Sequence, residues 1–234
     1  MKKGKKYIKA AELVDRSKLY TKEEAVDLVK KTSTSKFDAS VEIAFNLNLD
    51  TKKTDQQLRG AIVLPNGTGK AKTVLVLTKN SALKDAAKEA GAEFIGDDDL
   101  VAKIEKENWL DYDVIIASPE MMPALGKLGK VLGPRGLMPN PKTGTVTTDI
   151  KKAVEDVKKG RIEYRTDSYG NIHAVIGKVS FDNDKLLENL IAIVTVIVKS
   201  KPQTVKGAFV KNISISSTMG PGIKIDLGSF DKLN

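Results

Sequence analysis

The residues that could carry out acid–base or metal chemistry are few in this 234-residue chain. The single histidine, His173, lies in a strand-like segment and has no evident orienting partner, which general acid–base catalysis needs. The sequence contains no cysteine, so disulfides and thiolate metal sites are excluded. It also lacks the His/Cys cluster that would bind zinc or iron. We therefore predict no catalytic residue, no metal site and no cofactor.

Two segments lie where a phosphate-binding loop could be sought, and neither matches the pattern that such a loop requires. Residues 65–71, PNGTGKA, end like a P-loop, but Leu64 stands in place of the first glycine and Ala71 in place of Ser or Thr. The apolar segment 73–78 is followed by KNSA, with no glycine to let a pyrophosphate approach the backbone. A nucleotide-binding enzyme is the alternative function that these differences count against.

An acidic cluster, Asp97, Asp98 and Asp99, could be taken for a cation site. It stands where a helix is expected to begin. Acidic residues at that place are explained by capping and by the helix dipole, so we expect a structural role for them.

The charge of the chain favours a polyanionic partner. Lys and Arg number 39 against 30 Asp and Glu, which gives a net charge of +9 and a pI of about 9.4. Such an excess suits nucleic acid or an anionic membrane surface. The most apolar run, residues 190–198, is nine residues long, whereas a membrane-spanning helix needs about 20. We therefore expect a soluble protein with no membrane partner, and the absence of cysteine and of a signal peptide fits a cytoplasmic location.

Three segments are candidates for contact with RNA. Residues 121–148 contain no acidic residue, four Pro and five Gly, and the four cations Lys127, Lys130, Arg135 and Lys142. A basic, glycine-rich loop of this kind suits close approach to phosphates, although a solvent loop is the alternative. Residues 36–40 and 217–222 each offer an apolar side chain, Phe37 or Met219, among hydroxyls and glycines. Such segments can pack on ribose and bases, although Phe37 could equally belong to a core.

The elements that must position these segments divide the chain into two kinds of fold. Residues 41–49 have large apolar side chains at a strict period of two, with Glu42, Asn46 and Asn48 on the other side, which predicts a half-buried strand after a helix at 21–31. After Gly160 we expect a hairpin of 162–165 and 172–179, a helix at 184–198, and strands at 210–216 and 223–227. These elements predict an antiparallel sheet backed by helices, an α+β arrangement.

The middle of the chain has a different pattern. Continuous apolar strands are expected at 73–78, 94–96 and 113–117, and they alternate with helices at 81–90 and 98–107. This order predicts a parallel α/β sheet covered on both faces, a small Rossmann-like unit. Residues 68–159 carry a net charge of +1, against +5 for residues 1–67 and +3 for 160–234. We therefore expect a discontinuous basic domain of residues 1–67 and 160–234, with a Rossmann-like domain of residues 68–159 inserted in it.

Three strings of the sequence closely resemble signatures of the bacterial L-one family of ribosomal proteins. They are TSTSKFDASVEIAFNLNLD, GKLGKVLGPRGLMPNPKTGTV and STMGPGIKID, and the resemblance is collinear over essentially the whole chain. It implies a two-domain structural protein of the large ribosomal subunit that binds the large-subunit (23S) ribosomal RNA. It also implies a place in the mobile stalk near the exit site for deacylated transfer RNA, and repression of the protein's own operon through its messenger RNA.

The resemblance also implies which residues bind RNA. In the first string these are Lys36, Phe37, Ser40 and Glu42, and in the last string Thr218, Met219 and Gly220. Glu42 would accept a hydrogen bond from a ribose 2′-OH or a base amino group rather than meet a phosphate. Ser217 and Pro221 are expected to shape the turn. The resemblance leaves open what residues 121–148 contact, and their charge suggests transfer RNA or neighbouring ribosomal RNA.

Overall fold

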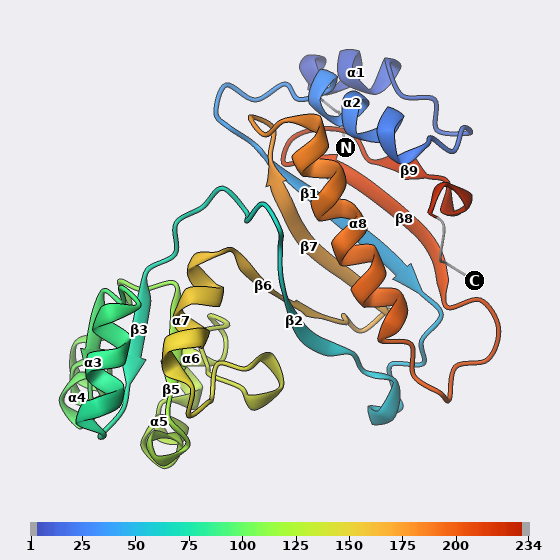
Figure 1. Ribbon diagram of the computed structural model, residues 1–234. Coiled ribbons are helices and arrows are strands. Elements are labelled where there is room, and N and C mark those ends of the chain that lie inside the picture. Colours follow the sequence, from blue (N-terminus) through green and yellow to red (C-terminus); the bar gives the residue numbers. More distant parts are fainter. Residues whose placement is uncertain (1–3, 231–234) are drawn as a thin grey trace. The chain divides into compact units, whose positions relative to one another are not determined.

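A computed structural model describes residues 4–230 (Figure 1). The chain forms two compact units. One ends at Gly69 and resumes at Ile162, and we call it the terminal unit; the other, Lys70–Arg161, is the inserted unit. Each has a hydrophobic core of its own.

The terminal unit is built on a four-stranded antiparallel sheet. Its strands lie in the order β7 (Asn171–Lys178), β1 (Ser40–Leu47), β8 (Val210–Ser217) and β9 (Ile223–Ile225). The predicted alternation in β1 is confirmed, because Val41, Ile43, Phe45 and Leu47 are buried while Glu42 and Asn46 are exposed. The sheet therefore has one apolar face and one polar face.

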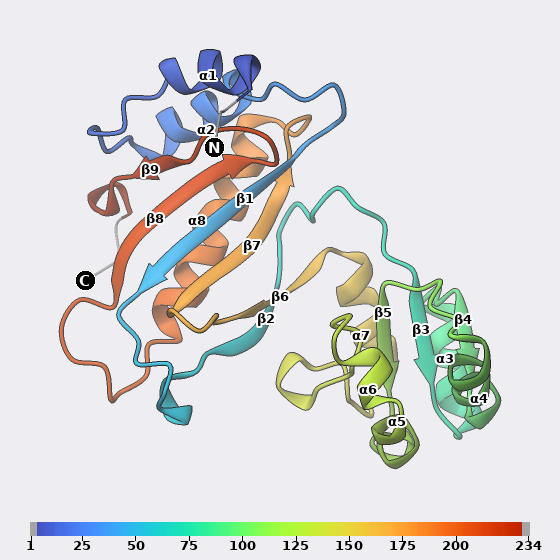
Figure 2. The ribbon, with the colours of Figure 1, turned by 180° about the vertical axis from the view of Figure 1, so that it is seen from behind.

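Helices cover the apolar face only. The elements that pack there are α2 (Lys22–Lys31) and α8 (Asn183–Lys199), and α1 (Lys5–Glu12) precedes them. Thr21 caps α2 through the reciprocal bonds with Glu24 that define a capping box. Figure 2 shows β7, β1 and β8 in front of α8, and no other described element of the terminal unit lies over this side of the three strands.

The expected hairpin of residues 162–165 and 172–179 is wrong in its pairing. β6 (Arg161–Arg165) pairs with β2 (Arg59–Val63), whereas β7 pairs with β1. The turn itself is present, since Thr166 bridges Ile172 and the backbone N–H of Asp167 donates to the carbonyl of Asn171. Beyond this bridge the two strands diverge to different sheets.

A short 3₁₀ turn, Thr54–Gln56, precedes β2, and another, Leu227–Ser229, follows β9.

The inserted unit has a three-stranded parallel sheet with helices on both faces, as predicted. Its strands lie in the order β4 (Phe94–Gly96), β3 (Val74–Leu77) and β5 (Val114–Ala117). One face packs against α3 (Ser81–Glu89) and α7 (Ile150–Lys158). The other face packs against α4 (Asp98–Glu107) and the segment that follows β5.

The interpretation of residues 121–148 as a loop without packed helix is corrected by the structure. Two short helices, α5 (Met122–Lys127) and α6 (Gly129–Leu132), lie between the 3₁₀ turns Pro119–Met121 and Pro141–Thr143. Leu125, Leu128 and Leu132 follow one another at helical spacing and are buried against the sheet. The many glycines and prolines hid this apolar stripe from a reading based on composition.

The acidic cluster of Asp97, Asp98 and Asp99 has a structural role, but this role rests on ion pairs more than on helix capping. The side chain of Asp97 makes no cap bond to α4 and instead pairs with Lys84 at 2.7 Å, which holds the pKa of Asp97 below its ordinary value. Asp98 pairs with Lys79 at 2.8 Å.

None of the helices between residues 4 and 230 combines the length and apolarity needed to cross a bilayer.

Candidate nucleic-acid interface

Residues 36–40 and 217–222, far apart in the sequence, are joined directly in the structure. The backbone N–H of Ser40 donates to Thr218 Oγ1 at 3.1 Å, and the N–H of Thr218 donates to the carbonyl of Ser40 at 3.1 Å. These bonds extend the pairing of β1 with β8, in which Val41 lies opposite Ser217. Two of the three sequence segments expected to contact RNA are therefore one continuous surface.

Two large apolar side chains stand exposed on this surface. Phe37 and Met219 each expose 59% of their area. The alternative that Phe37 belongs to the core is therefore excluded. The backbone beside Phe37 is held locally, because Ser35 Oγ donates to the carbonyl of Phe37 at 3.0 Å. Exposed apolar groups on a bonded backbone are suited to packing against ribose and base faces.

The turn after β8 is tight. The N–H of Gly220 donates to the carbonyl of Ser217 at 2.9 Å, and Ser217 and Pro221 are buried below the turn. Thr218 and Met219 are exposed at its tip. This arrangement agrees with the expectation that Ser217 and Pro221 shape the turn while their neighbours face outward.

The charges near Ser40 leave one cation unpaired. Lys178 Nζ lies 3.0 Å from Ser40 Oγ and so donates to it, and the carboxylate of Asp38 accepts from the N–H and hydroxyl of Ser180. Lys36 is exposed, and within residues 4–230 no ion pair or hydrogen bond holds its ammonium group. A phosphate could therefore meet Lys36 without first displacing an acidic side chain.

The surface continues onto the uncovered face of the sheet. Glu42 is exposed there, and its cross-strand neighbour on β8 is Ser216. The next row contains Ala44, Ser214 and Lys224 on β1, β8 and β9. Small side chains make this face shallow, and its hydroxyls and carboxylate can bond to ribose 2′-OH groups and base edges.

Sequence reasoning missed Ser214, Ser216 and Lys178. The two serines alternate with the buried Ile213 and Ile215, so the period of two places them on the polar face of their strand. The sequence does not reveal the register of β1 against β8. That register places Ser216 beside Glu42, about 170 positions away in the chain.

The four cations expected in residues 121–148 belong to the inserted unit and are exposed. They are Lys127, Lys130, Arg135 and Lys142. In the described part of the chain none of them takes part in an ion pair, so each is available to an anionic partner.

His173 is exposed on the uncovered face of the sheet, and its Nε2 lies 3.8 Å from Asp167 Oδ2. Burial raises the pKa of Asp167, but hydrogen bonds from Asn171 and Tyr169 together have the larger effect. The pKa of Asp167 is therefore held below its ordinary value. The carboxylate of Asp167 therefore stabilises the turn before β7 by accepting these hydrogen bonds. No three His, Asp or Glu side chains among residues 4–230 come together as metal ligands.

A comparison with protein families identifies a family that covers most of the chain. The sequence model of the ribosomal protein L1p/L10e family matches residues 29–221. The matched range begins in α2, contains residues 36–40 and the whole inserted unit, and ends within the 217–222 turn. It confirms the resemblance drawn from the three strings.

Proposed function

We propose a function for this chain from one premise, that it belongs to the ribosomal protein L1p/L10e family. Its general role follows from the family and is structural and RNA-binding, in association with the ribosome. The family is not a catalytic one. Our proposal concerns the surface that binds, the RNA that is bound and the purpose of binding.

The proposed RNA-binding surface is the one that joins β1 to the turn after β8, on the terminal unit. Phe37 and Met219 pack on ribose or base faces, and Lys36 meets a phosphate. The hydroxyls of Ser40 and Thr218 and the carboxylate of Glu42 bond to 2′-OH groups or base edges, and Gly220 allows the tight turn that presents Met219 to the RNA. The partner is a stem-loop of the large-subunit (23S) ribosomal RNA.

One observation carries this proposal. Phe37 and Met219 are both 59% exposed, and the segments that hold them are fixed to each other by hydrogen bonds between Ser40 and Thr218. Exposing two large apolar groups on one surface has a cost in water unless a partner covers them. An RNA surface of ribose rings and bases is a partner that the positive charge of the chain also favours.

The finer parts of the proposal rest on the family. The protein would form the mobile stalk of the large subunit and take part in release of deacylated transfer RNA from the exit site. It would also repress translation of its own operon by binding a similar structure in the messenger RNA. In the inserted unit, Lys127, Lys130, Arg135 and Lys142 are proposed as secondary contacts to RNA, with transfer RNA or neighbouring ribosomal RNA.

Met219→Asp tests the main surface. A carboxylate in place of the thioether would face ribose and phosphate, so we expect affinity for the ribosomal RNA stem-loop to fall at least tenfold, or about 1.4 kcal/mol. Filter binding or gel-shift titration measures the loss. Because Met219 is exposed, the melting temperature should change by no more than about 2 °C.

The matched control is Ile191→Asp. Ile191 is 42% exposed and lies on α8, which packs on the opposite face of the sheet, so the same change there should leave RNA affinity within about twofold. Equal affinity of wild-type protein and Met219→Asp would remove the turn from the interface.

No observation favours the nucleotide-binding enzyme as a second function, since the segment between β3 and α3 has no glycine.

A further inference from the structure

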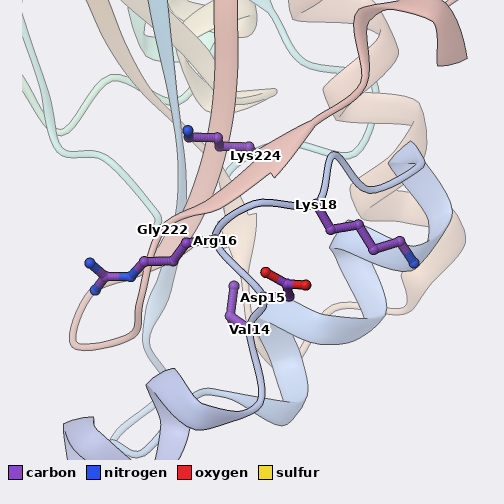
Figure 3. A pocket seen from close by; sticks show the side chains of 6 residues that line it. All are labelled: Val14, Asp15, Arg16, Lys18, Gly222 and Lys224. Atoms are coloured by element: carbon purple, nitrogen blue, oxygen red, sulfur yellow. The ribbon is translucent and has the colours of Figure 1, made fainter.

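A pocket adjoins the proposed interface at the far end of the 217–222 turn (Figure 3). Its volume is about 340 Å³, and its lining residues are Val14, Asp15, Arg16, Lys18, Gly222 and Lys224. The segment between α1 and α2 forms one wall, and the end of the turn with β9 forms the other. Three of the six lining side chains are cations and one is an anion, so the pocket carries a net positive charge.

Two of these cations have no partner among the residues that the structure describes. Lys18 Nζ lies 3.5 Å from Glu24 and over the ring of Tyr20, and in Figure 3 it extends away from Gly222. Arg16 extends instead toward the side of Gly222. Within residues 4–230, neither Arg16 nor Lys224 forms an ion pair or a side-chain hydrogen bond.

The wall that carries Arg16 is fixed against β9. The N–H of Asp15 donates to the hydroxyl of Tyr20 at 2.9 Å, and the N–H of Tyr20 donates to the carbonyl of Lys224 at 3.0 Å. Tyr20 is buried, and its carbonyl accepts from the N–H of Asp226 at 2.8 Å. The backbone beside the two cations is therefore ordered before any ligand binds, which lowers the entropy cost of binding.

The one acidic side chain of the pocket is already satisfied within its own loop. The carboxylate of Asp15 accepts from the hydroxyl of Ser17 at 2.5 Å and from its N–H at 2.9 Å. These bonds hold the pKa of Asp15 below its ordinary value, so it stays charged near neutral pH. Its hydrogen bonds go to Ser17, and within residues 4–230 it forms no ion pair with Arg16.

The position of Lys224 relates the pocket to the proposed interface. Lys224 lies opposite Ser214, which lies opposite Ala44 in the row next to Glu42. Lys36 and Lys178 stand near β1 and β7, whereas Lys224 and Arg16 stand at the β9 side. Since neighbouring strands are about 4.8 Å apart, β7 and β9 are separated by about 14 Å. Cations therefore stand on two sides of a shallow face of hydroxyls.

We propose that Arg16 and Lys224 bind a backbone phosphate of the same RNA that packs on Phe37 and Met219. The inference rests on the proposed function and extends its footprint to Lys224, which lies within the last string, and to the segment of Arg16, which lies outside all three strings. The wide, shallow minor groove of A-form RNA presents 2′-OH groups between two lines of phosphates. The uncovered face, with cations on both sides, is complementary to that pattern.

The test is the double variant Arg16→Gln/Lys224→Gln in the full chain. We expect affinity for the ribosomal RNA stem-loop to fall about tenfold at 0.15 M salt. The slope of log affinity against log salt should decrease by one to two, as for the loss of one or two phosphate contacts. Ethylation of individual RNA phosphates should then reveal a position that weakens binding to the wild-type protein but not to the variant.

The control is Lys199→Gln/Lys206→Gln, which removes two exposed charges from the same unit at the end of α8 and the loop beyond it. If both double variants lose the same small amount of affinity, only net charge matters and the phosphate site is overturned. That outcome with Met219→Asp still defective would leave the proposed function intact. If the wild-type protein does not bind the stem-loop, the proposed function itself fails.

Discussion

Gly220 is the position where the interface depends most directly on the absence of a side chain. A β-carbon placed there would lie 2.3 Å from Ser217 Oγ. The hydroxyl of Ser217 is buried and has no hydrogen-bond partner among the described residues. The turn that presents Met219 is therefore packed so closely that one methyl group would displace it.

Gly220→Ala should weaken RNA binding through this clash. We expect a destabilisation of about 1 kcal/mol or more from overpacking, together with a loss of RNA affinity of at least threefold, measured by thermal unfolding and gel-shift titration. Ser217→Ala alone should be nearly neutral, because the lost hydroxyl makes no bond. It should rescue Gly220→Ala, since the next contact, Ser217 Cβ at 3.5 Å, is an ordinary one. Without that rescue, Gly220 would matter for its contact with RNA and not for the space in the turn.

At the scale of elements, Asp113 ties the beginnings of two neighbouring strands together. It immediately precedes β5, and its carboxylate accepts from the N–H of Thr73, just before β3, at 3.1 Å. Lys70 Nζ also donates to it, at 2.7 Å. The hydrogen bond from Lys70 leads the interactions that hold the pKa of Asp113 below its ordinary value.

Asp113→Asn should destabilise the inserted unit by about 1 kcal/mol at pH 7. A carboxyl whose pKa is lower in the folded state stabilises it above the unfolded pKa, near 3.8, and loses that effect as pH falls through the folded pKa. The difference between wild-type protein and variant should therefore shrink below about pH 4. Trp109, the single tryptophan, lies in this unit and can report its unfolding in urea. Asp111→Asn, at an exposed neighbour, is the control, and a constant difference across pH would contradict this account.

The sequence predicts elements better than their pairing. The strand at 40–47 and the helix at 22–31 were predictable because apolar spacing and the Thr21 cap are local signals. The predicted hairpin was wrong because β6 and β7, although neighbours in sequence, pair with β2 and β1, which lie about 100 or more positions earlier in the chain. The helices within 121–148 were not predicted because glycine and proline outnumber the three buried leucines of this segment. Phe37 and Met219 were identifiable from their strings, whereas the pocket that Arg16 and Lys224 line depends on the bonds of Tyr20, which the sequence does not reveal.

At the scale of the whole molecule, the proposed recognition surface belongs to one unit. The core of the terminal unit draws buried residues from both ends of the chain, on α2 and β1 as well as on α8 and β8. The proposed contacts with Phe37 and Met219, and the pocket of Arg16 and Lys224, use no residue between 70 and 161. A unit with its own core can in principle fold alone.

Residues 1–69 joined to 162–234 by a short glycine-serine linker should therefore fold and bind the ribosomal RNA stem-loop. We expect affinity within about tenfold of the full chain, the difference measuring what the cations of the inserted unit add. Circular dichroism and a cooperative thermal transition establish folding before binding is measured. Met219→Asp within this shortened protein should reduce affinity by the same factor as in the full chain. A shortened protein that folds but fails to bind would place recognition in the inserted unit, with Lys127, Lys130, Arg135 and Lys142 as the principal contacts.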